Sequence, residues 1–251
     1  MLTQNELKYY SALLQKKYRQ QEQKFIVEGK RLVEEALKSN YKCEVVIMSE
    51  FYAKKDHSTV EKFSKHLRTE IITEDNFKKI AETKAPQGIA AVVSIPSSPI
   101  KISKDEKLIV AIENISDPGN VGTIIRTCDW FGVKSVIVSP ESVDVFNPKV
   151  IRSTMGSLFH INVYNSSDFY TDLVELKQKG RKILCSAMHG ENIFSYRSKE
   201  RAILILSNEA HGPTEEMLKL SDQTITIPKY GNAESLNVAS AAAVIIAELI
   251  K

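Results

Sequence analysis

The sequence predicts an α/β protein with two domains, the second of which is built on a parallel sheet. Two observations predict this class. In the C-terminal half, short apolar segments of strand length alternate with helical patterns, which is typical of a parallel sheet with crossover helices. Between the halves, residues 94–99 are rich in Pro and Ser and lead into a charged stretch, which indicates a linker. The expected boundaries are 1–95 for the first domain, 96–106 for the linker and 107–251 for the second domain.

Both halves divide into short elements. Before the linker we expect a small α/β layer with helices over about 5–16, 29–39, 58–67 and 75–81 and strands over 44–48 and 89–93. After the linker we expect strands near 108–112, 135–138, 161–164, 182–186, 203–206 and 224–227. Helical patterns follow the first and last of these strands, at 121–131 and 236–250.

Composition excludes several classes of protein. With 251 residues, 43% of them hydrophobic and 26% charged, the chain is ordinary for a soluble protein. Its polar N-terminus has no apolar signal region, and its most apolar stretch, 236–250, is shorter than the roughly 20 residues of a membrane span. Cys43, Cys128 and Cys185 have no Cys-x-x-Cys spacing, so neither a disulfide framework nor a metal site is indicated. We expect a cytoplasmic protein with no membrane contact and no metal.

The excess of basic over acidic residues lies in the first domain. Residues 1–100 hold 17 of the 34 Lys and Arg residues but 13 of the 31 Asp and Glu residues. Cations of this kind make phosphate contacts in RNA-binding proteins. A solvated helical face would explain so mild an excess equally well, so charge alone leaves both interpretations open. The candidate RNA contacts in this segment are Lys16, Lys17, Arg19, Lys24 and Arg31.

Three polar loops follow strands of the second domain. The first loop, 114–120, leads into a helix that carries Arg126, and the second loop, 207–213, also precedes a helix. The third loop, 228–237, precedes the apolar C-terminal helix. The carboxyl ends of parallel strands share one edge of the sheet, where α/β folds bind ligands. The three loops together therefore predict a binding site.

The third loop is suited to a small polar ligand. Pro228 and Gly231 prevent a regular element there. Ser235 and Asn237 stand where a helix begins, and the unpaired backbone N–H groups of a helix start point outward. Capping of the helix is the simpler role for both residues, and capping and ligand binding are compatible.

These loops resemble the three signature motifs of the SpoU/TrmH family of the SPOUT superfamily, which are RNA ribose 2′-O-methyltransferases. The resemblance lies in Asn120-x-Gly122-x-x-x-Arg126, Asn208-Glu209-x-x-Gly212 and Ile227-Pro228-x-x-Gly231-x-x-x-Ser235-Leu236-Asn237. A further family segment is Arg152-Ser153-x-x-Gly156-Ser157-Leu158-Phe159, and Arg152 joins the candidate RNA contacts through it. Lys24–Gly29 and Gln87–Ala90 resemble the start and end of the substrate-binding domain of these enzymes. The resemblance spans nearly the whole chain.

The resemblance implies a fold, a cofactor and partners. The second domain would be a SPOUT domain with a deep trefoil knot, and the first would be an L30e-like domain. The cofactor would be S-adenosylmethionine, the substrate a ribose 2′-hydroxyl in rRNA or, less favoured, tRNA, and the active protein a homodimer. Residues at cofactor-binding positions of the family are Ser207, Asn208, Gly212, Ile227, Gly231 and Leu236, and those at catalytic positions are Asn120, Arg126, Glu209, Ser235 and Asn237.

The chemistry of Arg126 suggests its role. A guanidinium stays protonated in proteins, with a pKa above about 12, so it does not act as a base. We expect Arg126 to hold the target phosphate and to stabilise the developing 2′-alkoxide, while the proton leaves to a phosphate oxygen, Glu209 or water. The alternative is a surface cation on a helix. Cys128, Trp130 and Phe131 on the same helix are expected to pack.

Two positions depart from the family pattern, and they bear on which of three functions the sequence favours. Family members usually have Gly at the position of Ser207 and often at that of Ala210, so each adds a Cβ beside the expected cofactor pocket. Those departures favour a catalytically inactive RNA-binding or ribosome-assembly protein, whereas the retained polar residues favour the enzyme. A dinucleotide-dependent oxidoreductase is disfavoured, because residues 117–122 do not supply Gly-x-Gly-x-x-Gly.

Overall fold

The computed structural model of the chain describes residues 2–96, 102–198, 200–208 and 211–251. It divides into two compact units, one of residues 1–99 and 146–159 and the other of residues 100–145 and 160–251. Residues 97–101, in the expected linker, lie outside the described residues. The segment 146–159 falls within the range 107–251 expected for the second domain, yet it packs in the first unit.

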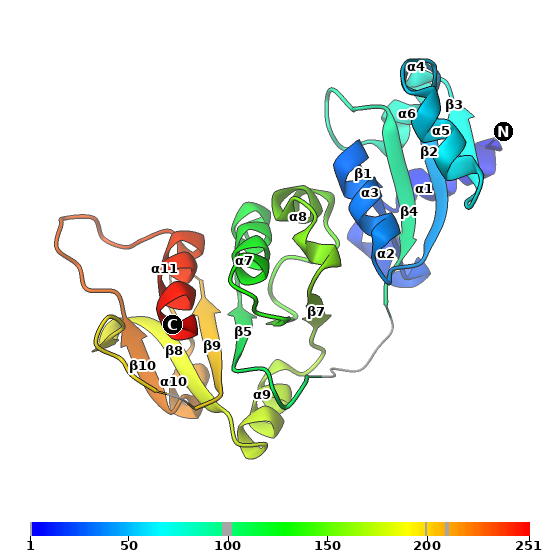
Figure 1. Cartoon of the computed structure of the whole chain (residues 1–251). Helices are drawn as coiled ribbons and strands as arrows, with labels where there is room; N and C mark the ends of the chain where they lie inside the picture. Colours follow the sequence, from blue (N-terminus) through cyan, green and yellow to red (C-terminus); the bar gives the residue numbers. More distant parts are fainter. Residues whose placement is uncertain (1, 97–101, 199, 209–210) are drawn as a thin grey trace. The chain divides into compact units, whose positions relative to one another are not determined.

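The first unit is built on a four-stranded mixed sheet in the order β1-β4-β2-β3 (Figure 1). The strands are β1 (Lys24–Glu28), β2 (Cys43–Ser49), β3 (Thr69–Ile72) and β4 (Ile89–Ser94). β4 pairs antiparallel with β1 and β2, and β2 pairs parallel with β3. The sequence analysis expected β2 and β4 but missed β1 and β3, because a strand of four or five residues with charged neighbours carries little periodicity.

Helices cover both faces of this sheet. They are α1 (Gln4–Ala12), α2 (Lys16–Glu22), α3 (Lys30–Lys38), α4 (Glu50–Lys55), α5 (His57–Ser64), α6 (Glu74–Ile80) and α8 (Pro148–Thr154). Leu7 of α1 and Phe77 of α6 pack against one face in a buried cluster with Ile26 and Val92. The expected helix over 5–16 is two helices, because the chain turns at Leu13 and continues as α2.

The segment 146–159 is held in the first unit by apolar and ionic contacts. Phe146 packs on Phe25, with ring centroids 4.8 Å apart, and Phe159 packs edge-on against Tyr41 at 5.2 Å. Gly156 has a φ of +108°, and a Cβ there would lie 2.9 Å from Cγ of Glu35. Only glycine fits such a backbone and such an approach, so the family segment 152–159 serves to dock this stretch on α3.

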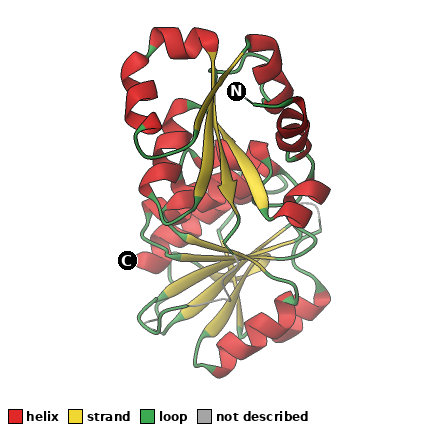
Figure 2. Cartoon of the chain, turned by 90° about the vertical axis from the view of Figure 1, so that its right-hand side faces the viewer, coloured by secondary structure: helices red, strands yellow, loops and turns green. Residues whose placement is uncertain are grey.

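The second unit is built on six parallel strands in the order β10-β8-β9-β5-β6-β7, which confirms the expected α/β class. They are β5 (Leu108–Glu113), β6 (Ser135–Val138), β7 (Asn162–Asn165), β8 (Lys182–Asn192), β9 (Ala202–Ser207) and β10 (Gln223–Thr226). Figure 2 shows these strands fanned by the twist of the sheet. The expected strands agree within three residues at each end except for β8, which runs on to Asn192.

Four helices flank this sheet and leave its carboxyl edge to loops. They are α7 (Pro118–Trp130), α9 (Phe169–Gln178), α10 (Glu215–Leu220) and α11 (Val238–Ile250). Leu173 of α9 and Met217 of α10 share a buried cluster with Ile109 and Ile203 of the sheet. α11 packs on α7, and Cys128 is buried between apolar neighbours. Within the described ranges, no helix combines the length and the apolar character needed to cross a membrane.

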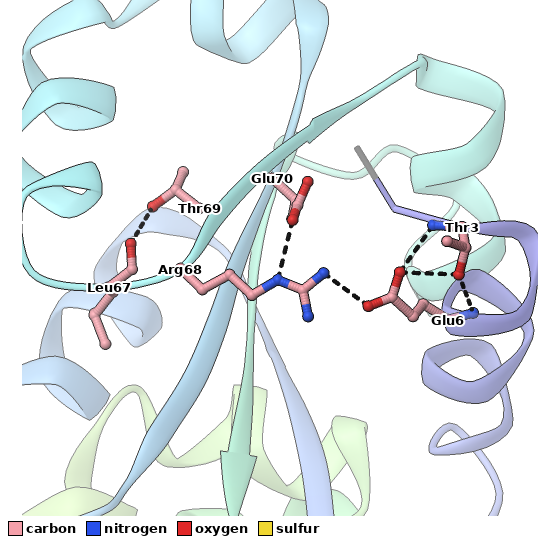
Figure 3. Close-up of polar contacts among 6 residues, drawn as sticks. All are labelled: Thr3, Glu6, Leu67, Arg68, Thr69 and Glu70. Atoms are coloured by element: carbon pink, nitrogen blue, oxygen red, sulfur yellow. Dashed lines mark hydrogen bonds and ion pairs between the residues drawn. The ribbon is translucent and has the colours of Figure 1, made fainter.

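A network around Arg68 ties the first helix to the sheet of the first unit (Figure 3). Thr3 caps α1 by accepting from the Glu6 backbone N–H, and the Glu6 carboxylate accepts in return from the Thr3 backbone N–H at 2.9 Å. The Arg68 guanidinium then bridges Glu6, at 2.7 Å, and Glu70 of β3, at 3.0 Å. The N–H of Thr3 and the guanidinium of Arg68 lower the pKa of Glu6 to about 2.

We expect the contribution of Glu6 to depend on pH. Its pKa is lower in the folded chain than the ordinary 4.5, so its stabilising effect is complete above about pH 4.5 and is lost as the pH falls toward 2. The difference in unfolding free energy between wild type and Glu6→Gln should therefore be constant from pH 7 to 5 and should shrink below pH 4.5. Urea unfolding at several pH values measures it. Glu61→Gln on the exposed face of α5 is the matched control. A difference in unfolding free energy between wild type and Glu6→Gln that stays constant down to pH 3 would contradict the network.

Candidate active site

The second and third loops enclose a cavity of about 290 Å³ at the carboxyl edge of the larger sheet. This size suits a small-molecule site. All six residues expected at cofactor-binding positions line it: Ser207, Asn208, Gly212, Ile227, Gly231 and Leu236. The sequence spreads these residues over 30 positions, and the order of the parallel strands brings them together.

A wider cavity of about 1020 Å³ adjoins the first. The two share Asn208, Gly212 and Ser235 in their walls. Asn120 of the first loop and His211 of the second face only the wider one. Residues of all three loops thus surround two neighbouring spaces, which is the arrangement that a two-substrate reaction needs.

Asn237 connects the third loop to the first. Its side-chain oxygen accepts from the backbone N–H groups of Ala239, at 3.0 Å, and Ser240, at 3.3 Å, which caps α11. Its Nδ2 donates to Oδ1 of Asn120 at 2.9 Å. One side chain therefore fixes the start of α11 and orients Asn120. Ser235, expected beside it at the helix start, is exposed and lies in the loop before the cap.

Asn208 connects the second loop to the first. Its Nδ2 donates to the carbonyl of Asn114 at 3.1 Å, and its own carbonyl accepts from the Gly212 N–H at 2.8 Å. Asn114 and Gly212 both have left-handed backbones, with φ of +55° and +66°, a conformation that asparagine and glycine tolerate. A Cβ at Gly212 or Gly231 would meet no described protein atom within 4 Å.

Arg126 is exposed on α7 and is not among the residues that line either cavity. It stands six residues after Asn120, which is roughly 9 Å along a helix axis. Glu209, the other charged catalytic candidate, and Ala210 lie outside the described residues.

The structure adds cavity residues that the sequence analysis missed. Ala187 and Met188 of β8 line both spaces, and Tyr230 of the third loop lines the smaller one. Tyr230 is 90% exposed and Met188 57%, so both present apolar surface at the rim. β8 ends in Met-His-Gly-Glu-Asn, which is a polar sequence at the end of a strand, like the starts of the three polar loops. This pattern could have predicted that β8 contributes residues to the site.

One packing expectation for α7 was wrong. Cys128 is fully buried as expected, but Trp130 at the end of the helix is 84% exposed. The physical reason is its position on the helix, since Trp130 follows Cys128 by about 200° around the axis and so points away from the sheet.

The candidate RNA contacts of the first unit differ in accessibility. Lys16, Lys17 and Arg31 are exposed. The expectation that Arg19 contacts RNA was wrong. Its side chain is 2% exposed and donates to the carbonyls of Leu13 and Leu14, so it caps α1 instead of facing solvent. Two others are half-buried and engaged in ion pairs, Lys24 with Glu44 at 2.7 Å and Arg152 with Glu82.

The parallel sheet with its looped cavity defines the class as an α/β enzyme that binds a small molecule at the carboxyl edge of its strands. The model of the SpoU rRNA Methylase family matches residues 107–247, and that of the MRM3-like substrate binding domain matches residues 4–91. The chain belongs to the SpoU rRNA Methylase family. It is thus an RNA 2′-O-methyltransferase that uses S-adenosylmethionine.

Similar proteins match the chain over nearly its full length. The 23S rRNA (guanosine(2553)-2′-O)-methyltransferase RlmP of Bacillus subtilis is 36% identical over 246 residues, 97% of this chain and 95% of that protein. A TrmH-family structure from Porphyromonas gingivalis has a TM-score of 0.88 at 32% identity, over 99% of this chain and 98% of the other. The SpoU methyltransferase AviRb from Streptomyces viridochromogenes, in complex with AdoMet, has a TM-score of 0.86 at 26% identity, over 99% and 97%.

We expect Asn237→Ala and Asn237→Ser to test the capping role of Asn237. Both lose the bond to Asn120, but serine remains a good helix cap whereas alanine is not. Asn237→Ala should lower the free energy of unfolding by about 1 kcal/mol, and Asn237→Ser should lie near the wild type. Urea unfolding measures this, and equal stability of the alanine variant and the wild type would contradict the capping role.

Proposed function

We propose that this protein transfers a methyl group from S-adenosylmethionine to a ribose 2′-hydroxyl of 23S rRNA. The observation that carries the proposal is the gathering of all six cofactor-position residues around one cavity, with Asn120 and Ser235 in the adjoining one. The similar Bacillus subtilis protein, named as a 23S rRNA 2′-O-methyltransferase, supports this choice of substrate over tRNA.

The smaller cavity fits the cofactor chemically. Its rim presents Met188, Tyr230 and Leu236, which are apolar surfaces of the kind that hold an adenine ring. Polar groups of the second and third loops, among them Asn208 and Ser235, provide hydrogen-bonding partners for the polar parts of the molecule. The cofactor supplies an electrophilic methyl group when bound, and the loops hold it in a fixed orientation.

The wider cavity is where the ribose would lie. Asn120, held by Asn237, and Ser235 are placed in its wall to orient the 2′-hydroxyl toward the smaller cavity. Holding two reactants in line removes much of the entropic barrier to their reaction. In this assignment Asn120, Ser235 and Asn237 position the ribose 2′-hydroxyl. Its proton leaves to a phosphate oxygen, Glu209 or water.

Arg126 is proposed to bind the target phosphate and to stabilise charge that develops on the 2′-oxygen. Its exposure on α7 leaves the guanidinium free to meet RNA from outside the cofactor cavity. A planar fork of donors matches phosphate geometry, which a single ammonium does not.

We expect Arg126→Lys to lower methyl transfer by about 100-fold or more, as loss of a transition-state donor does, while S-adenosylmethionine binding stays within twofold of the wild type because Arg126 lies outside that cavity. Calorimetry measures the affinity, and primer-extension mapping of 2′-O-methyl sites on 23S rRNA from a deletion strain measures the product. Retention of most turnover by Arg126→Lys would overturn its role. Binding of RNA without any methylation by the wild type would favour the inactive RNA-binding protein.

The first unit is proposed to bind the RNA through exposed cations. Lys16 and Lys17 of α2 and Arg31 of α3 are exposed to solvent, whereas Arg19 is buried and Lys24 is paired with Glu44. Phosphate contacts weaken with salt in proportion to their number. The same unit is proposed to have the L30e-like fold.

We expect Lys16→Gln with Lys17→Gln to weaken rRNA binding uniformly across sequences and to reduce the slope of log K against log salt by about 1 to 2, since each phosphate contact contributes about 0.9. Arg19→Gln should instead lower stability, because its guanidinium caps α1. Filter binding between 50 and 300 mM salt distinguishes these effects. An unchanged slope of log K against log salt for the double variant would show that residues other than Lys16 and Lys17 contact the RNA.

A homodimer and a knotted second unit complete the proposal. α7 and α11 pack on each other, and Trp130 and Ile250 at their ends are 84% and 40% exposed, which is apolar surface that a second copy would cover. The position of β5 between β9 and β6, with the C-terminal helix on α7, is compatible with the trefoil knot of the family. Sedimentation equilibrium tests the dimer. The place of action would be the cytoplasm, where ribosomes are assembled.

A further inference from the structure

Glu113 is a buried acid whose role the family motifs do not assign. It is the last residue of β5, directly before the first loop, and is 1% exposed. Within the described part of the chain no cation pairs with its carboxylate. Burial of a charge is costly unless hydrogen bonds replace its water, so the contacts of Glu113 are the reason that it is tolerated.

Three hydroxyls and one backbone N–H surround this carboxylate. The Ser207 hydroxyl donates to Oε2 at 2.7 Å, and the Thr214 N–H approaches the same oxygen at 3.4 Å. The hydroxyls of Thr214 and Tyr170 lie 2.7 and 2.9 Å from Oε1. Those two hydroxyls are also 2.8 Å apart, so two protons are shared among three oxygens.

These partners lie at both ends of the second loop. Ser207 is its first residue and pairs with Glu113 across the parallel strands β9 and β5. Thr214 follows its last residue and caps α10 by accepting from the Met217 N–H. Between them, Asn208, His211, Gly212 and Pro213 line the cavities. A single carboxylate therefore anchors the loop where it leaves the sheet and where it enters the next helix.

Tyr170 contributes to this network from outside the cavities. It belongs to α9 and lines neither cavity. Burial, with a smaller effect of the charge on Glu113, raises the pKa of Tyr170 to about 12. The hydroxyl therefore keeps its proton at neutral pH and remains a donor. The buried thiol of Cys185 has its pKa raised to about 12 by burial and then by Glu113.

We propose that Glu113 is a positioning residue for cofactor binding, which acts by fixing both ends of the second loop through Ser207 and Thr214, with Tyr170 as its support. Ser207, where the family usually has glycine, adds a third hydroxyl to this anchor, and it directs this hydroxyl at Glu113 while it also lines the smaller cavity. The inference rests on the proposed use of the smaller cavity by S-adenosylmethionine.

The decisive variant is Tyr170→Phe, which removes one donor to Glu113 without changing any cavity residue. We expect it to weaken S-adenosylmethionine binding about tenfold, equivalent to about 1.4 kcal/mol at 25 °C, and to raise the KM for the cofactor while kcat at saturating cofactor stays within twofold. Glu113→Gln should have a larger effect, because the amide keeps only one of the two acceptor oxygens and directs an NH2 group at partners that donate to the carboxylate. Calorimetry and steady-state methylation with the full-length protein measure both quantities.

Matched measurements separate positioning from stability. Tyr196→Phe, outside this network, should leave the affinity and kcat unchanged. Thermal unfolding shows whether each variant is folded at the temperature of the titration, since a purely structural role would lower Tm and leave the Kd unchanged. The effect of Tyr170→Phe should differ in a Ser207→Gly background, because donors to the same carboxylate are coupled and their effects are not additive.

The outcomes are distinct. Wild-type affinity in both folded Tyr170→Phe and folded Glu113→Gln would overturn the positioning role and leave the proposed function standing. Absence of cofactor binding by the wild type would overturn the proposed function and this inference with it. A weakened Kd together with a matching loss of kcat would also contradict the inference, because it would place Glu113 in the chemical step.

Discussion

The pairing of β5 with β9 in parallel register is the constraint on which the site depends. That register sets Glu113 opposite Ser207, so the two loops that follow start side by side at one edge of the sheet. Asn114 and Asn208, one residue further along, then meet through a hydrogen bond. A slip of one residue would turn every side chain of a strand to the opposite face, and both the carboxylate anchor and the loop contact would be lost together.

The third loop reaches the same place by helix packing instead of strand pairing. Its strand, β10, lies at the far edge of the sheet, separated from β9 by β8. α11 returns across the sheet to pack on α7, and the bond from Asn237 to Asn120 joins the two helix starts. The cavity is therefore enclosed by a sheet contact on one side and a helix contact on the other.

Sequence patterns predicted the parts of the molecule that local chemistry determines. The apolar strands of the second unit and the cap at Asn237 follow from periodicity and helix-start chemistry, whereas the six cavity residues were implied only by the resemblance to the SpoU/TrmH motifs. The burial of Arg19 could not be predicted, because it depends on where α1 ends and how the chain turns at Leu13. Glu113 was missed for a related reason: its importance comes from neighbours distant in sequence, and a glutamate is not unusual at the end of a strand.

The docking of residues 146–159 in the first unit makes the two units topologically interleaved. The backbone passes from one unit to the other three times, after residues 99, 145 and 159, whereas two consecutive domains would need a single passage. A cut within 97–101 would leave the fragments joined by the Phe25–Phe146 and Tyr41–Phe159 contacts, and a chain begun at residue 102 would carry those aromatic faces without their partners. Exchange of the first unit between relatives therefore requires the matching stretch between β6 and β7 to be exchanged with it.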